Sequence, residues 1–223
     1  MVQALSRLAS SDKIAVEATG TEKRGTNQIQ LKSTIGLLYR PAEGHVFVEV
    51  LNFEDGKLIG RIAGDGIRLW HFDGRANTYS SYAYGSEDKG LDVSWSAKFF
   101  QSLRLKSTGP AAFAAKILDD AMNIGTKATA WLPWVPTATV ERYDNTVVCN
   151  AGNPAPNTTT YMLDGDDSNG FSLTSAQYVQ AGGQPKKWDL TFTVGALPEH
   201  TEFGFVPPRG ARMVTIGQST GGG

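Results

Sequence analysis

Cysteine is almost absent from this sequence, because Cys149 is the only one in 223 residues. One cysteine excludes an intrachain disulfide and a cysteine-based zinc cluster, and it leaves the redox compartment open. Cys149 lies in a predicted strand with no histidine close to it in sequence. We therefore favour a buried structural thiol over a catalytic nucleophile.

The sequence also has no excess of either charge: it contains 21 Lys and Arg and 22 Asp and Glu, and the formal net charge is −1. The basic surface of a nucleic-acid-binding protein is therefore not expected. No apolar run reaches the roughly 18 residues of a membrane span. The first residues lack the apolar core of a signal peptide, so either the protein is cytosolic or a signal was removed, and an envelope location would require the second. We expect one domain over residues 1–216, followed by a flexible tail at 217–223.

Motifs for nucleotides, metals and nucleophilic catalysis are missing as well. The sequence has no GxxxxGK[ST], no GxGxxG between a strand and a helix, and no GxSxG. Its three histidines lie far apart and form no paired-ligand spacing. The stretch "DGDDSNG" (164–170) resembles a calcium loop, but Asn169 stands where that loop needs glycine, so a hairpin turn is favoured. We expect no metal, no cofactor and no enzymatic activity.

Signals for β-strands are what the chain does contain. Alternating or β-branched segments separated by turn residues predict about eleven antiparallel strands. These segments are 13–20, 29–39, 45–53, 58–64, 67–72, 77–84, 139–144, 146–151, 159–165, 171–179 and 187–195. Asp-Gly pairs at 55–56, 65–66 and 73–74 predict tight hairpin turns, in which a type I′ geometry needs positive φ at both residues. Turn geometry thus accounts for the glycines and acids of "GDGIRLWHFDG" without a ligand, and Trp70 between them is expected to be a packing anchor.

Helix signals interrupt the strands in two places. Residues 2–9 predict one short helix, and a second helix begins near Pro110 and ends before Gly125. Its apolar stripe of Phe113, Ile117, Ala121 and Ile124 predicts one face for burial. A weaker helix signal over 96–107 contains Phe99 and Phe100. The connector "WLPWVPT" (131–137) then carries Trp131 and Trp134, which either anchor a loop to the sheet or form an apolar lip over a cavity.

Three motifs follow one another along the chain: a strand ending in Arg-Pro ("LYRPAEGHVFVEV"), a hairpin of the form DG-x-x-LW ("GDGIRLWHF"), and a C-terminal "FGFVPPRGA". Their order resembles the LolA/LolB lipoprotein-carrier superfamily, and most closely its uncharacterised, predicted periplasmic members. The matching residues are Arg40-Pro41, Asp65-Gly66, Leu69-Trp70, Phe203, Phe205, Pro207-Pro208 and Gly210-Ala211.

The resemblance implies an α+β fold: a curved, unclosed antiparallel β-barrel with helices covering its concave face. It also implies that lipid acyl chains are held between sheet and helices, with Arg40 helping to hold the helical lid. The candidate ligand-binding residues are Arg40, Phe99, Phe100, Phe113, Ile117, Ala121, Trp131 and Trp134. Apolar side chains such as Phe113 are equally what an ordinary core needs, so both interpretations stay open.

The sequence therefore favours a monomeric, non-catalytic protein of the periplasm or cell envelope that binds or transports a lipid or a lipidated protein. A 16-carbon chain offers on the order of 12 kcal/mol of gross burial, so no catalytic group is needed for such a role. The alternatives are an envelope sensor or interaction module of the RseB type, with a protein partner, or a structural protein without a ligand cavity. An enzyme would need two convergent ionisable groups, and the sequence shows no such pair.

Overall fold

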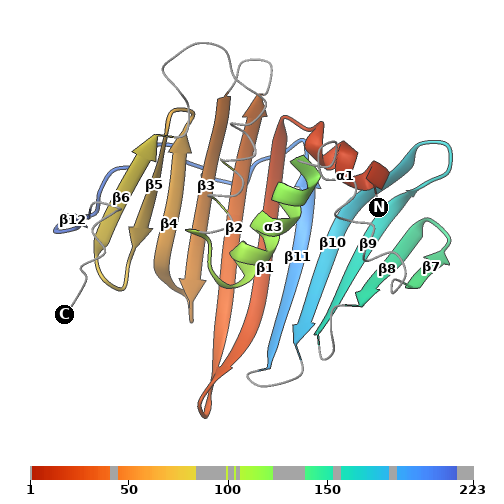
Figure 1. Ribbon diagram of the computed structural model, residues 1–223, viewed down its shortest axis with the longest axis horizontal. Helices are drawn as coiled ribbons and strands as arrows, with labels where there is room; N and C mark the ends of the chain where they lie inside the picture. Colours follow the sequence, from red (N-terminus) through yellow and green to blue (C-terminus); the bar gives the residue numbers. More distant parts are fainter. Residues whose placement is uncertain are drawn as a thin grey trace, which may run out of the picture.

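The computed structural model describes residues 2–40, 45–83, 99, 103, 106–122, 139–152, 157–180 and 185–214 (Figure 1). The first half contains α1 (Val2–Ala9), β1 (Lys13–Arg24), β2 (Asn27–Arg40), β3 (His45–Glu54), β4 (Lys57–Asp65), β5 (Arg68–Asp73) and β6 (Thr78–Ala83). The second half contains α3 (Gly109–Met122), β7 (Thr139–Tyr143), β8 (Thr146–Gly152), β9 (Asn157–Asp166), β10 (Gly170–Gln180), β11 (Lys186–Val194) and β12 (Arg212–Met213).

The strands form one sheet of 12 strands in the order β12-β6-β5-β4-β3-β2-β1-β11-β10-β9-β8-β7. Every pairing is antiparallel except that of β12 with β6, which is parallel. The prediction of an unclosed antiparallel sheet is thus confirmed, and the short β12 is the strand that the sequence pattern missed. Because β1 pairs with both β2 and β11, the two halves of the chain meet in the middle of the sheet (Figure 1).

Alternation along the central strands decides which side chains are buried. In β1, Ile14, Val16 and Ala18 are fully buried, whereas Glu17 between them is exposed. Successive side chains of a strand point to opposite faces, so these apolar residues share one face. The two helices lie on that face (Figure 1), and we call it the helical face. α3 packs against β1, β2 and β11, while α1 packs against β10 and α3.

The helices agree with the sequence pattern where the structure describes them. α1 covers the predicted 2–9, and α3 has Pro110 in its first turn. Of the weaker segment 96–107, residues 99, 103 and 106 are helical. Within the described part of the chain, no helix combines the length and the apolar character that a membrane crossing requires.

Two of the three Asp-Gly hairpins are built differently from the prediction. Asp55 and Gly56 have φ values of 47° and 79°, which fits a type I′ turn. At the next hairpin only Gly66 has positive φ, at 95°. There the Asp65 carboxylate accepts hydrogen bonds from the backbone N–H groups of residues 67 and 68, at 3.0 and 2.8 Å. A side-chain acceptor therefore replaces the second left-handed residue.

The hairpin between β5 and β6 also departs from the type I′ prediction. Gly74 does not have positive φ, and the left-handed residue of this turn is Asn77, with φ of 50°. The Gly74 N–H donates to the carbonyl of Ile59 at 2.9 Å, and a Cβ on Gly74 would lie 3.1 Å from the Leu58 carbonyl oxygen. Glycine is needed here because two backbone segments approach closely.

The acidic stretch 164–170 is a hairpin turn, as predicted. It joins β9 to β10, and Asp166 accepts hydrogen bonds from the N–H groups of Ser168 and Asn169 at 2.9 and 2.6 Å. A hydrogen bond from the Ser168 hydroxyl, together with these backbone bonds, holds the pKa of the Asp166 carboxyl well below its ordinary value. The carboxylate thus stabilises its own turn.

The C-terminal segment, residues 195–214, packs against the opposite face of the sheet, which we call the outer face. Phe205 stacks on Trp70 with 6.2 Å between ring centroids, and its ring also lies 5.5 Å from that of Tyr79. The rings of Phe203 and Phe47 are tilted against each other, with 5.7 Å between their centroids. Two motifs of the family resemblance, the "LW" hairpin and the "FGF" segment, therefore meet in space. Trp70 is a packing anchor, as predicted.

A buried ion pair fastens the same segment to the sheet. Glu49 on β3 and Arg61 on β4 lie on the outer face and form an ion pair of 2.7 Å. Glu49 also accepts a hydrogen bond from the Glu202 N–H at 2.9 Å, and Arg61 donates to the carbonyls of Glu202 and Gly204. Each charge thus has a partner, which a charge on a covered face requires.

Candidate functional site

The helical face forms one continuous apolar layer under α1 and α3. The buried cluster draws residues from β5, β4, β3, β2, β1, β11, β10 and β9, which are consecutive in the sheet. It also includes Phe99, Leu103 and the sheet-facing residues of both helices. Most of the α3 residues in it are small: Ala111, Ala114, Ala115 and Ala121. Small side chains let the helix backbone lie close to the sheet.

Four of the predicted lining residues come together in this layer. Phe99, Ile117 and Ala121 are fully buried, and Phe113 is nearly so. None of them lines either of two pockets that open among the described residues. In this conformation the four side chains are therefore packed against the sheet. Phe100, Trp131 and Trp134 lie outside the described residues.

Arg40, the residue taken from the family resemblance, lies at the exposed end of β2. It is opposite His45 in the register of β2 with β3. Gly36 on the same strand faces Thr201 of the C-terminal segment, so alternation assigns Arg40 to the outer face. The chain between Arg40 and His45 lies outside the described residues.

An aromatic cluster that the sequence pattern did not indicate packs against the first turn of α3. Tyr178 and Trp188 stack at 5.0 Å between ring centroids, and Phe113 lies 5.6 Å from Tyr178. Gly20 provides the space, since a Cβ at this position would lie 2.4 Å from Trp188 Cδ1 and 3.1 Å from Pro110 Cγ. Only the register of β1, β11 and β10 brings these residues together, so sequence spacing could not reveal the cluster.

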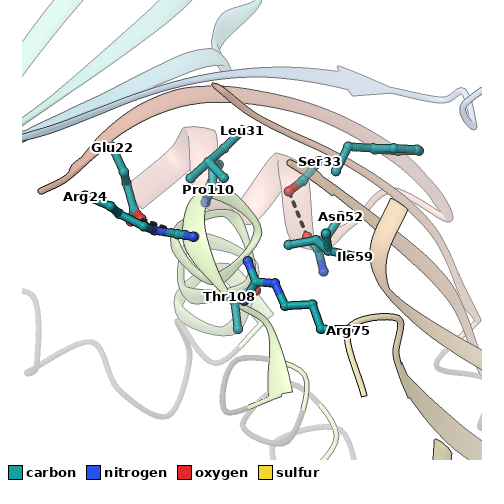
Figure 2. Close-up of a pocket in the computed structure, with 11 residues that line it drawn as sticks. Glu22, Arg24, Leu31, Ser33, Asn52, Ile59, Arg75, Thr108 and Pro110 are labelled. Carbon is teal, nitrogen blue, oxygen red and sulfur yellow. Dashed lines mark hydrogen bonds and ion pairs between the residues drawn. The ribbon is translucent and has the colours of Figure 1, made fainter. Parts of the chain in front are cut away.

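A small polar pocket opens at the start of α3, at one end of the apolar layer (Figure 2). Its volume is about 90 Å³. It is lined by Glu22, Arg24, Leu31, Ser33, Asn52, Phe53, Ile59, Arg75, Thr108, Gly109 and Pro110. Figure 2 shows that the Ser33 hydroxyl points to Asn52, and the hydrogen bond that it donates to Oδ1 measures 2.8 Å. Both of these polar side chains are buried.

Charged side chains surround the mouth of this pocket. Arg24 pairs with Glu22 at 3.0 Å and with Glu54 at 2.9 Å, and Arg75 pairs with the same Glu54 oxygen. Lys186 lies 3.3 Å from Glu22. The hydrogen bond with Glu22 is the largest of the effects that raise the pKa of Arg24 above its ordinary value. Among the described residues, this network contains three cations and two carboxylates.

A larger hollow of about 420 Å³ lies beside the polar pocket, around the β1–β2 hairpin. Its lining is Thr21, Glu22, Lys23, Thr26, Gln28 and Pro185. The larger hollow is lined mainly by polar residues, and the smaller one by polar and apolar residues in similar number. The described residues of the apolar layer are at most 8% exposed, so their side chains are packed, and we call this arrangement the closed state.

The ionisable groups with shifted pKa values do not share one pocket in the described residues. Burial lowers the pKa of His71 on β5, and Lys106 lowers it further. Burial raises the pKa of the Cys149 thiol on β8, which is half-buried, and that of the Tyr161 hydroxyl on β9. The described side chains form no group of three His, Cys, Asp or Glu that could hold a metal ion.

No protein-family model matches the sequence, and no curated protein matches it. Among solved structures, the chain is similar to a DUF1329 family protein from Desulfovibrio piger, with 9% sequence identity and a TM-score of 0.37. That match covers 87% of this chain and 93% of the other. The chain is also similar to a LolA superfamily protein from Nitrosomonas europaea, with 11% identity, a TM-score of 0.32, and coverage of 88% and 94%.

Proposed function

We propose that this protein binds the acyl chain of a lipid or a lipidated protein, without catalysis, between the helical face of the sheet and α3. The family resemblance of the sequence motifs supports this role and a location in the periplasm or cell envelope. The half-barrel form, with helices over a concave helical face, belongs to the same proposal.

The observation that supports the proposal most is the width of the apolar layer. Its eight consecutive strands span seven spacings of about 4.8 Å, or about 34 Å. The described helices have 8 and 14 residues, which corresponds to lengths of about 12 and 21 Å at 1.5 Å per residue. The two helices together are about as long as the strip is wide, and the residues of the layer are already buried, so an acyl chain would have to displace a helix to reach this strip.

Binding requires α3 to separate from the sheet, because the four lining residues are packed in the closed state. Alanine buries less apolar area than leucine, so an alanine-rich helix costs less free energy to displace. An acyl chain that replaces it gains about 0.8 kcal/mol for each methylene group it buries. Phe100, Trp131 and Trp134 belong to the proposed site only through the sequence, whereas Arg40 lies on the outer face, on the other side of the sheet from this site.

Native mass spectrometry of the purified protein should detect co-purified lipid. Titration with saturated fatty acids of 8 to 16 carbons then tests how the chain is bound. We expect the dissociation constant to fall by up to about fourfold for each added methylene until the site is full. If no lipid co-purifies and affinity does not depend on chain length, the proposal is wrong.

A further inference from the structure

The C-terminal segment lies on the outer face of the sheet in the manner of an extended peptide. It crosses the sheet from the end of β11 to β12 (Figure 1). Thr201, Phe203 and Phe205 are half-buried, whereas the residues at 202, 204 and 206 are exposed. A period of two is that of an extended chain with every second side chain on the sheet.

The ion pair between Glu49 and Arg61 holds the backbone of this segment. The Glu49 carboxylate accepts the Glu202 N–H at 2.9 Å. Arg61 donates to the carbonyl oxygens of Glu202 and Gly204 at 2.9 and 3.0 Å. Nearly every residue type carries these backbone groups, so the ion pair is suited to other extended segments as well.

Two aromatic positions beside the ion pair select side chains. Phe203 packs on Phe47 of β3, with 5.7 Å between ring centroids. The ring of Phe205 lies 5.5 to 6.5 Å from three rings of β5 and β6, those of Trp70, Phe72 and Tyr79. The surface therefore fits two aromatic residues separated by one. We call Phe47, Glu49, Arg61, Trp70, Phe72 and Tyr79 the outer site.

The segment is held less firmly than the strands that it covers. None of residues 195–214 is buried. Among the described residues, backbone-to-backbone hydrogen bonds join it to the sheet only at its ends, at Gly195 and in residues 212–214. Segments with few buried contacts open locally at a lower free-energy cost than the whole fold.

The segment also leaves one donor of the outer site unused. Arg61 Nε is buried and has no hydrogen-bond partner in the part of the chain that the structure describes. A buried donor without an acceptor is costly. A ligand that supplies one more acceptor than this segment would therefore fit the outer site better.

We propose that the outer site binds an extended segment of a partner protein in which two aromatic residues are separated by one. The chain's own residues 202–205 occupy the site when the partner is absent. Backbone hydrogen bonds to the ion pair provide affinity, and the two aromatic positions provide specificity. The site lies on the opposite face from the apolar layer, so the proposal depends neither on acyl binding nor on the position of α3.

A labelled peptide tests the site in the whole chain. The double variant F203A, F205A removes the two competing rings and keeps the outer site. Fluorescence anisotropy should show that the peptide EHTEFGFVPPRG (residues 199–210) binds this variant at least tenfold more tightly than the unsubstituted chain. The same peptide with alanine at both phenylalanines should bind the variant at least tenfold more weakly. If the two peptides bind it equally, or neither binds, the proposal is overturned.

Two further substitutions in the double variant test where the peptide binds. F47A removes a wall of the outer site and should weaken binding at least fivefold. M162A is the matched control, because Met162 lies on the outer face of β9, is 42% exposed and belongs to the other half of the sheet. It should leave binding unchanged. If M162A weakens binding as much as F47A does, the assignment to the outer site is overturned.

Hydrogen exchange tests the opening of the segment without any substitution. The Glu202 N–H, which is bonded to Glu49, should exchange at least tenfold faster than the amides of the central strand β1. Equal protection would make the segment a permanent part of the fold and overturn the proposal.

Light scattering tests the other possible occupant, a second copy of this chain. The unsubstituted protein should stay monomeric over a tenfold range of concentration. A dimer that forms with rising concentration and is absent in the double variant identifies the second copy as the occupant and overturns the assignment to a different partner.

Discussion

Gly20→Ala tests whether α3 is the element that moves. Gly20 lies in β1 beneath the first turn of α3. A Cβ there would be 2.4 Å from Trp188 Cδ1, 2.9 Å from the Lys187 carbonyl oxygen and 3.1 Å from Pro110 Cγ. All three distances are too short, so the added methyl group strains the closed state. Overpacking of this kind costs about 1–3 kcal/mol.

Only part of that strain disappears when α3 leaves the sheet. The contact with the Lys187 backbone persists in both states. The contact with Pro110 is lost on opening, and the Trp188 ring gains space into which it can turn. If about 1 kcal/mol is released, the open state becomes about fivefold more populated. We therefore expect Gly20→Ala to lower the free energy of unfolding and to bind a 16-carbon fatty acid about fivefold more tightly.

Gly36→Ala is the matched control, because Gly36 lies in the paired strand β2 but faces the outer side. Its Cβ would meet Thr201 Cγ2 at 2.8 Å and Pro198 Cδ at 3.1 Å, in the C-terminal segment. Urea unfolding should show a similar loss of stability, and fluorescence titration should show unchanged fatty-acid affinity. If both variants lose stability and neither gains affinity, α3 does not gate the apolar layer.

Three further outcomes follow from the packing. Arg61→Met should cost about 3–5 kcal/mol in urea unfolding, because it leaves the Glu49 carboxylate buried without its cation, and the double variant with Glu49→Gln should recover part of that loss. Phe205→Ala removes the half-buried ring that stacks on Trp70 and should cost about 2 kcal/mol, with faster hydrogen exchange at the β6 edge. Burial, with Asp120 as a smaller cause, raises the pKa of Tyr161 above the ordinary 10.0. The unfolded state therefore loses this proton at a lower pH than the folded state, so stability should fall as pH rises above 10. Urea midpoints measured at pH 9 and 11 should show a smaller fall for Tyr161→Phe than for the unsubstituted protein.

The strands were predictable because burial on one face imposes a period of two. Ile14, Val16 and Ala18 alternate with polar or small residues, and the structure buries these three completely. Hairpin positions were also predictable, because an Asp-Gly pair marks a tight turn through its own backbone preferences. Their turn types were not, since an Asp side chain can accept backbone hydrogen bonds and replace positive φ, as Asp65 and Asp73 do.

The pocket at the start of α3 was not predictable, because its residues come from separate elements. Glu22, Asn52 and Arg75 are about 25 residues apart along the chain, and neighbouring motifs give no sign of them. They meet only because β1 to β4 pair in one register and the β5–β6 turn folds back beside them. Pairing over such distances depends on the whole sheet, whereas a sequence motif records a local spacing.

The stripe of Phe113, Ile117 and Ala121 shows a different limit of sequence reasoning. The stripe is buried as predicted, but burial extends further round α3, to Leu118 and Asp119, so the prediction of a single buried face is too narrow. The stripe does not indicate whether that burial is permanent, because a fixed core and a lid need the same apolar residues. The distinction depends on the free energy between docked and displaced α3, which is a small difference between large packing terms. The contact between Gly20, Trp188 and Pro110 sets part of that difference, so a single methyl group at Gly20 should shift it measurably.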